Sequence, residues 1–252
     1  MLEIKTNTDA VLKLLEELPR NQIPFATALA LTRTAQKVHE EIKRKLPSIY
    51  DRPTPWTVGG MYVKPARKNA LSASVKFKDR SEATKGLPAA EYLQPSVYGV
   101  ARKPKAFERL LQRAGVLPSG WYAVPSKYVA LDSYGNVPRG TVTKILSQLQ
   151  ASRDSAQNER ASVRRKRNRR QMYGRYFLAY PSREITRHLT PGIYERIGGG
   201  MAVRPVFLFV DKPPVYRQRF RFFVEAETIA RRIQPDMFRE AIAETMATMQ
   251  KA

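Results

Sequence analysis

The clearest pattern in the chain is an apolar stripe with helical spacing near the N-terminus. Its members recur at steps of three and four residues: Leu31, Ala35, Val38, Ile42 and Leu46. This spacing places them on one face of an α-helix. Asn21 is a suitable N-cap and Pro47 disfavours continuation, so the pattern predicts a long helix over residues 22–46. A shorter helix is predicted over residues 10–18.

Alternation of apolar and polar residues predicts strands in the middle of the chain. Residues 71–78 alternate strictly, as in a strand with one buried face. Residues 56–64 are predicted to be its antiparallel neighbour. Residues 92–100 are predicted as a third strand, which Pro95 would restrict to a sheet edge or a bulge. A further strand over residues 121–131 is interrupted at Pro125.

The rest of the chain continues this mixture of helices and strands. Helices are predicted over residues 107–114, after Pro138, over residues 216–233 and from Pro235 onward; strands are predicted over residues 176–180 and 203–210. Residues 206–210 are apolar throughout, which is typical of a central strand. We therefore expect an α+β fold, with a long N-terminal helix and C-terminal helices packed on a mainly antiparallel sheet.

This fold is expected to form a single domain over residues 1–252. Two proline-rich stretches, residues 47–55 and 88–104, are predicted to be extended arms that reach over a neighbouring subunit. Residues 152–175 are predicted to be a basic, arginine-rich insertion.

Composition adds a large positive charge to this picture. The 252 residues include 45 Lys+Arg and 22 Asp+Glu, a net charge of +23. Spread over a compact chain, this charge stores on the order of 12 kcal/mol after physiological screening, comparable to the stability of an ordinary domain. We therefore expect a polyanionic partner. The chain has no Cys, which excludes disulfides and thiolate metal sites, and no apolar run approaches the length of a membrane span.

The charge is densest between residues 160 and 175, where no acidic residue occurs. The eight basic residues are Arg160, Arg164, Arg165, Lys166, Arg167, Arg169, Arg170 and Arg175. Arginine binds phosphate groups without reading base sequence, but a solvated loop or an acidic protein partner explains the run equally well. Tyr173, Tyr176 and Phe177 follow and could stack on bases, although core packing is favoured for at least half of them.

Catalytic patterns are weak in this sequence. The two histidines, His39 and His188, have no metal-ligand spacing around them. Gly198–Gly200 lack the following Lys-Ser/Thr of a phosphate loop and favour a hairpin turn. No cluster of acidic residues suggests hydrolysis or a two-metal site. We therefore predict no catalytic residue, no metal and no cofactor.

Two stretches resemble a known family. The run Pro24-Phe25-Ala26-Thr27-Ala28-Leu29-Ala30-Leu31-Thr32-Arg33-Thr34-Ala35-Gln36-Lys37-Val38 is similar to the alanine-rich opening helix of the tailed-phage minor tail protein Z family. Arg204-Pro205-Val206-Phe207-Leu208 is similar to a strand that precedes the C-terminal helix in phage tail-completion proteins.

The resemblance implies a structural virion protein, made in the host cytoplasm, that joins tail to head at the neck or upper tail as part of a ring. Its implied partners are further copies of itself and other tail or neck proteins, with double-stranded DNA as an additional contact and no membrane. A stand-alone, sequence-nonspecific nucleic-acid-binding protein is the alternative, and a DNA-processing enzyme is a weaker one.

Overall fold

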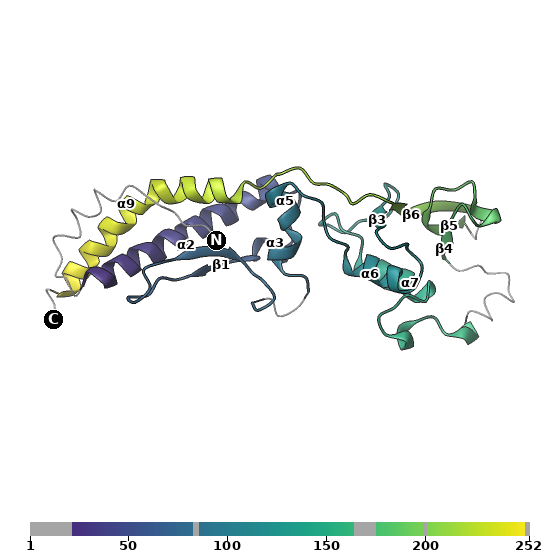
Figure 1. The fold of residues 1–252 in the computed structure, drawn as a ribbon, viewed down its shortest axis with the longest axis horizontal. Coiled ribbons are helices and arrows are strands. Elements are labelled where there is room, and N and C mark those ends of the chain that lie inside the picture. Colours follow the sequence, from purple (N-terminus) through teal and green to yellow (C-terminus); the bar gives the residue numbers. More distant parts are fainter. Residues whose placement is uncertain (1–21, 83–85, 164–174, 199–200, 250–252) are drawn as a thin grey trace. The chain divides into compact units, whose positions relative to one another are not determined.

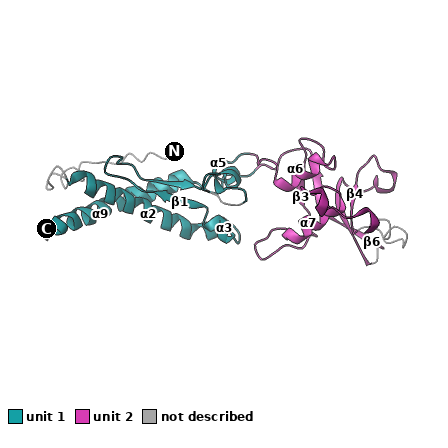
Figure 2. Cartoon of the chain, turned by 90° about the horizontal axis from the view of Figure 1, so that it is seen from below, with its two compact units in different colours: residues 1–100, 216–252 teal, residues 101–215 magenta. Residues whose placement is uncertain are grey.

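The computed structural model describes residues 22–82, 86–163, 175–198 and 201–249 (Figure 1). The chain divides into two compact units: unit 1 comprises residues 1–100 and 216–252, and unit 2 comprises residues 101–215 (Figure 2). Each unit contains its own large cluster of buried apolar side chains. The expected single domain is therefore replaced by two units. The helix predicted over residues 10–18 lies outside the described residues.

Two long helices form the body of unit 1. Helix α2 spans Ile23–Ile49 and helix α9 spans Phe222–Met249, and they lie side by side along most of their length (Figure 1). The predicted stripe faces inward, since Val38, Ile42 and Leu46 are at most 2% exposed. These side chains pack against apolar residues at the start of α9, which confirms the long N-terminal helix.

Two prolines lie inside these helices, contrary to the predicted breaks. Pro47 lies in the last turn of α2, where its missing N–H removes only one helical hydrogen bond. Pro235 lies within α9, which runs through it as one bent helix rather than two (Figure 1). Residues 216–221, predicted to be helical, precede α9 in a non-helical conformation. Tertiary packing of α9 along α2 compensates for the lost hydrogen bond at Pro235.

The described part of unit 1 also contains a small hairpin and three short helices. The bounds are α3 Pro55–Val58, β1 Met61–Lys64, β2 Ser74–Phe77, α4 Ala89–Tyr92 and α5 Gln94–Tyr98. β1 and β2 are antiparallel, as predicted. The strand predicted over residues 92–100 is wrong, and residues 88–104 are not simply an extended arm. Pro95 lies in the first turn of α5, directly after Gln94, at a position where a helix does not use the N–H. Of the other predicted arm, residues 47–49 belong to α2 and Pro55 begins α3.

Unit 2 is built on a four-stranded antiparallel sheet. Its strands are β3 Tyr122–Pro125, β4 Tyr176–Ala179, β5 Gly192–Ile197 and β6 Ala202–Val210, in the order β3-β6-β5-β4. β6 is central, as its apolar run predicted. Opposite β5, the register slips by one residue between Ile193 and Tyr194. Pro205 lies at this irregularity, where a residue without an N–H is tolerated.

Short helices pack beside this sheet and close the core of unit 2. They are α6 Ala106–Arg113 and α7 Arg139–Gln148, with 3₁₀ turns η1 Ser155–Gln157 and η2 Glu184–Thr186. Leu111 of α6, Ile145 of α7 and Ile193 of β5 are fully buried together. The chain is thus of the α+β class, with a long N-terminal and a long C-terminal helix and antiparallel strands.

Candidate polyanion-binding surface

The predicted basic segment belongs to unit 2, and the structure describes its two ends. Arg160 follows the η1 turn and is exposed. Arg175 immediately precedes β4, with 57% of its side chain exposed. The remaining six residues lie outside the described residues: Arg164, Arg165, Lys166, Arg167, Arg169 and Arg170.

Both flanks of this segment are attached to the C-terminal end of α7. On one side, the Glu159 N–H donates to the Ser147 carbonyl oxygen at 3.1 Å. On the other, the Tyr176 N–H donates to the side-chain oxygen of Gln148 at 2.9 Å. Ser147 and Gln148 are neighbours in the last turn of α7. The fold therefore holds residues 159 and 176, which flank the basic segment, at the same end of α7.

A buried carboxylate organises the arginines beside this point. Glu195 of β5 has a side chain that is 5% exposed and accepts hydrogen bonds from Arg175 and Arg204. The Arg204 Nε lies 2.8 Å from the carboxylate. Burial by itself raises the pKa of Glu195, but the hydrogen bonds from Arg204 and Arg175 outweigh it and hold the pKa below its usual range. Two cations share one anion here, so the cluster keeps a net positive charge.

Aromatic rings support further guanidinium groups on the same strands. The Arg196 guanidinium lies over the Phe177 ring at 4.1 Å from its centroid, and Phe177 also contacts Tyr194. Tyr176 is buried in the core of unit 2, which confirms core packing for that residue. Tyr173 lies outside the described residues. Phe177 is half-buried, and its ring is covered by the Arg196 guanidinium. Neither Tyr176 nor Phe177 therefore exposes a free ring face on which a base could stack.

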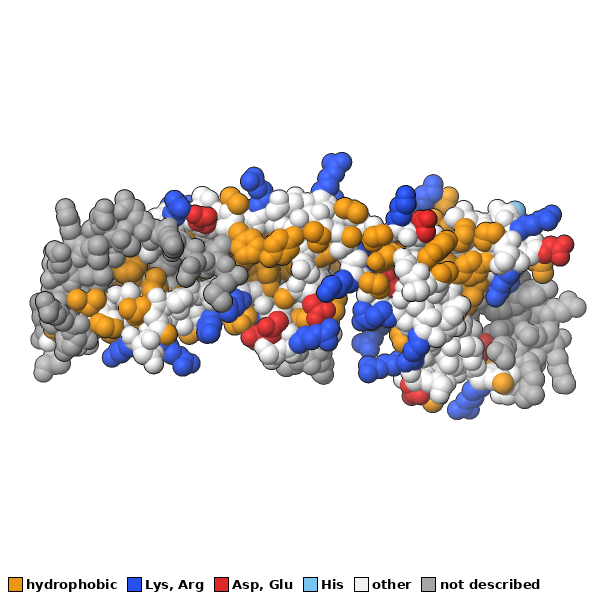
Figure 3. Space-filling model, in the orientation of Figure 1, with side chains coloured by type: hydrophobic (Ala, Val, Ile, Leu, Met, Phe, Trp, Pro, Cys, Tyr) orange, Lys and Arg blue, Asp and Glu red, His pale blue; other side chains and the backbone are white. Residues whose placement is uncertain are grey.

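Unit 2 carries a large excess of positive charge, and most of its acidic groups form contacts within the fold. Residues 101–215 hold 22 basic and 7 acidic side chains, a net charge of +15, whereas unit 1 carries the remaining +8. Glu108 and Glu195 are buried in ion pairs with arginine. Asp132 and Asp154 accept backbone N–H groups in turns. On the face that Figure 3 shows, Lys and Arg side chains outnumber acidic ones over unit 2.

The other candidate groups from the sequence are the two histidines and the glycine run that begins at Gly198. His39 lies half-buried on α2, where burial lowers its pKa, and His188 is exposed in unit 2. Gly198 lies between β5 and β6, which pair antiparallel on either side of it, so the hairpin prediction is confirmed. Among the described residues, no group of three or more His, Cys, Asp or Glu side chains could hold a metal ion.

Sequence reasoning missed the two buried carboxylates that organise unit 2. Glu195 lies on the same face of β5 as the buried Ile193. Glu108 lies among the apolar residues of α6 and is itself buried. The sequence did contain one signal for these buried carboxylates, namely an acidic residue at a position where the periodic pattern expects an apolar one. Its arginine partners, however, come from positions that no spacing rule connects to it, such as Arg204 on the next strand.

Comparisons with protein-family models, with curated proteins and with solved structures find no match for this chain. None of the helices in the described part of the chain is long and apolar enough to cross a membrane.

Proposed function

We propose that the chain is a structural virion protein of a tailed phage, a minor-tail or tail-completion subunit that assembles as a ring and joins tail to head. In this proposal unit 2 docks on a negatively charged partner. The observation that carries it is the imbalance of unit 2, in which 22 basic side chains face 7 acidic ones and several acidic groups are engaged internally.

The positions of the two family-like stretches support this assignment. Residues 24–38 form the first half of α2, and residues 204–208 lie within the central strand β6. The long helix α9 follows β6 in the chain. Each stretch therefore occupies the kind of element in which the resembling family carries it, a long opening helix and a strand before a C-terminal helix.

Docking by unit 2 is electrostatic. Arginine and lysine side chains attract phosphates or carboxylates, and contacts of this kind position a partner without reading sequence. If the partner is DNA, each phosphate neutralised adds about −0.9 to the slope of log affinity against log salt. The six arginine and lysine residues of 164–170 would give a slope of roughly −5.

The proposal is tested with matched charge variants. Replacing Arg164, Arg165, Arg167 and Arg170 by Gln removes four charges from the basic segment of unit 2. The control replaces Arg44, Arg217, Arg219 and Arg221, which are exposed in unit 1, and removes the same number of charges. We expect the first variant to fold normally but to yield unjoined heads and tails, while the control assembles.

A duplex-DNA titration against salt separates the possible partners. Loss of about 3.6 from the salt slope in the first variant alone identifies DNA as the partner. An assembly defect without DNA binding at low salt identifies an acidic protein. Absence of the chain from purified tailed particles would overturn the proposal. In that case, tight duplex binding by the free chain would support the alternative, a stand-alone nucleic-acid-binding protein, for which the specific observation is that both flanks of the basic segment are held at the end of α7.

A further inference from the structure

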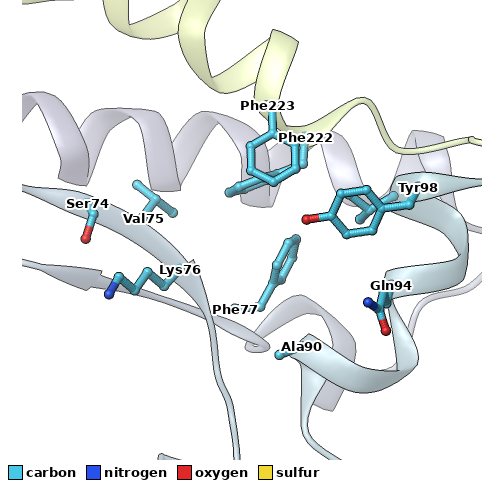
Figure 4. A pocket seen from close by; sticks show the side chains of 10 residues that line it. Ser74, Val75, Lys76, Phe77, Ala90, Gln94, Tyr98, Phe222 and Phe223 are labelled. Atoms are coloured by element: carbon cyan, nitrogen blue, oxygen red, sulfur yellow. The ribbon is translucent and has the colours of Figure 1, made fainter. Parts of the chain in front are cut away.

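Unit 1 contains a cavity of about 350 Å³ that is poorly suited to an anion. Its walls carry a group of aromatic side chains (Figure 4): Phe77, Tyr98, Phe222 and Phe223. Among the described residues that line it, Lys76 is the one that carries a charge. Binding of a phosphate group needs several positively charged donors in one place. The arginines around Glu195 in unit 2 meet this requirement.

Glu195 holds two arginine side chains on neighbouring strands of unit 2. Tyr176 of β4, Glu195 of β5 and Arg204 of β6 lie in one row across the sheet. Arg175 directly precedes Tyr176. One carboxylate oxygen of Glu195 accepts a hydrogen bond from Arg175 Nε. The other lies 2.8 Å from Arg204 Nε and 2.7 Å from its Nη2. Because both arginines contact one carboxylate, their bonded nitrogen atoms lie within about 8 Å of each other.

Each of these arginines keeps hydrogen-bond donors that the carboxylate does not use. Within the described part of the chain, the two Nη groups of Arg175 and the Nη1 group of Arg204 donate to no protein acceptor. The two side chains are 57% and 39% exposed. Arginine presents its donors as a planar fork that matches the oxygen atoms of a phosphate group. The unused donors are therefore accessible to an anion while the Nε atoms stay on Glu195.

The buried carboxylate orders both arginines before any partner binds. The Glu195 side chain is 5% exposed, and it belongs to a strand that is paired on both sides. A long side chain that becomes ordered only on binding loses rotamer freedom at that moment, which weakens the affinity. Arg175 and Arg204 are already held in the folded chain. Glu195 therefore favours the binding of an anion by this pair, although its own charge is negative.

The amount of charge on unit 2 favours nucleic acid over an acidic protein as the partner. The 22 basic and 7 acidic side chains of residues 101–215 leave a net charge of +15. A compact unit of this length has a diameter of about 34 Å. Duplex DNA carries about one negative charge per 1.7 Å of its axis, so a duplex that crosses unit 2 brings about 20 charges. A protein interface of standard size has about 20–30 residues a side, and about half of them would have to be acidic to match.

We propose that Arg175 and Arg204, positioned by Glu195, bind the phosphate backbone of duplex DNA. This inference rests on the proposed docking of unit 2 on a polyanion, and it names that polyanion. Contacts to phosphate groups fix the position of a duplex without reading its bases. Proteins that bind single strands offer free aromatic rings to the bases. Beside this pair, the rings of Tyr176 and Phe177 are each faced by an arginine, which favours the duplex over a single strand.

The sign of a charge effect tests the positioning role of Glu195. The full chain and its variants are titrated with a duplex DNA at several salt concentrations. Glu195→Gln and Glu184→Gln each remove one negative charge from unit 2, and Glu184 is exposed. If charge alone determined the affinity, both variants would bind the duplex more tightly. We expect this of Glu184→Gln, whereas Glu195→Gln should bind about fivefold or more weakly because its arginines are no longer ordered. Binding by Glu195→Gln as tight as that of Glu184→Gln would overturn the proposal.

A second variant keeps every charge and does not depend on the stability of Glu195→Gln. Arg175→Lys combined with Arg204→Lys can still pair with Glu195, but it lacks the planar fork. We expect its duplex affinity to fall about tenfold with an unchanged salt slope. The control combines Arg183→Lys with Arg187→Lys, two exposed arginines of unit 2, and should change the affinity by less than about twofold. Tryptophan fluorescence confirms that each variant is folded.

The remaining outcomes distinguish this inference from the proposed function. An equal loss of affinity in the two lysine variants, or tighter binding of a single strand than of the duplex, would overturn the inference. Failed assembly of the Arg175 and Arg204 variant, with no duplex binding by the natural chain at low salt, would also overturn it and would identify an acidic protein partner within the proposed function. If the natural chain binds the duplex through this pair but is absent from tailed particles, the inference stands and the proposed function fails.

Discussion

The change Glu108→Gln tests how unit 2 is held together. The Glu108 side chain is 1% exposed and accepts four hydrogen bonds. Two come from the Arg102 guanidinium, at 2.6 Å from Nη1 and 2.5 Å from Nη2. The other two come from the backbone N–H groups of Lys105, at 2.6 Å, and Ala123, at 2.9 Å. One carboxylate thus connects the start of α6 to strand β3.

The expected cost follows from this geometry. Glutamine keeps the shape of the side chain, but it removes the negative charge and replaces one acceptor oxygen by a donor. Arg102, itself 9% exposed, then loses the negative charge of Glu108 with which it is paired. Breaking a buried pair in this way costs about 3–5 kcal/mol. That loss is a large part of the roughly 5–15 kcal/mol that stabilises an ordinary domain.

Urea unfolding followed by tryptophan fluorescence measures this loss. The chain has two tryptophans, Trp56 in unit 1 and Trp121 in unit 2, so Trp56→Phe makes the signal specific for unit 2. Glu184→Gln, an exposed acidic residue of unit 2, is the control and should change stability by less than about 0.5 kcal/mol. Adding Arg102→Met to Glu108→Gln should recover part of the loss. If the Glu108→Gln protein were as stable as the control, the Arg102–Glu108 ion pair would not stabilise unit 2, and this reasoning would be refuted.

Three further changes test other parts of the fold. Gly192→Ala should destabilise unit 2 by several kcal/mol in the same assay, because the added Cβ would lie 2.3 Å from the Phe207 carbonyl oxygen; wild-type stability would contradict the β5–β6 pairing. Ile42→Ala should cost about 2–5 kcal/mol in unit 1, measured with Trp121→Phe, because Ile42 is fully buried; a loss below 1 kcal/mol would contradict the α2–α9 core. The pKa of Glu195 is lowered, so its stabilisation should be complete above the ordinary carboxyl pKa of about 4.3 and be lost as the pH falls below it; Glu195→Gln should reduce that acid sensitivity, and an unchanged pH profile would exclude the ion pair.

Strong local periodicity allowed the main elements to be predicted. The stripe through Val38 and Ile42 was enough to identify α2, and the apolar run of residues 206–210 was enough to place β6 at the centre of a sheet. The alternation at residues 71–78 led to β2 and its antiparallel neighbour. These patterns succeed because burial on one face acts on residues that are close in the sequence.

Proline was the main source of wrong boundaries. Pro95, Pro47 and Pro235 each suggested an interruption, yet each lies in a helix. Pro95 lies in the first turn of α5, where the backbone N–H groups have no helical partner, so no hydrogen bond is lost. At Pro235 one bond is lost, and the helix continues because both of its halves are packed in unit 1. A local rule cannot weigh that packing energy.

The sequence by itself determined the α+β class, the long opening helix and the charge of +23, because these depend on composition and on short-range spacing. The tertiary structure alone decided that the chain forms two units. It also decided that the flanks of the basic segment are held at the end of α7 and that Glu195 gathers Arg175 and Arg204. Each of these features joins residues that are far apart in the chain. The folding of a shared core brings such residues together, and no repeat or regular spacing in the sequence indicates which of them will meet.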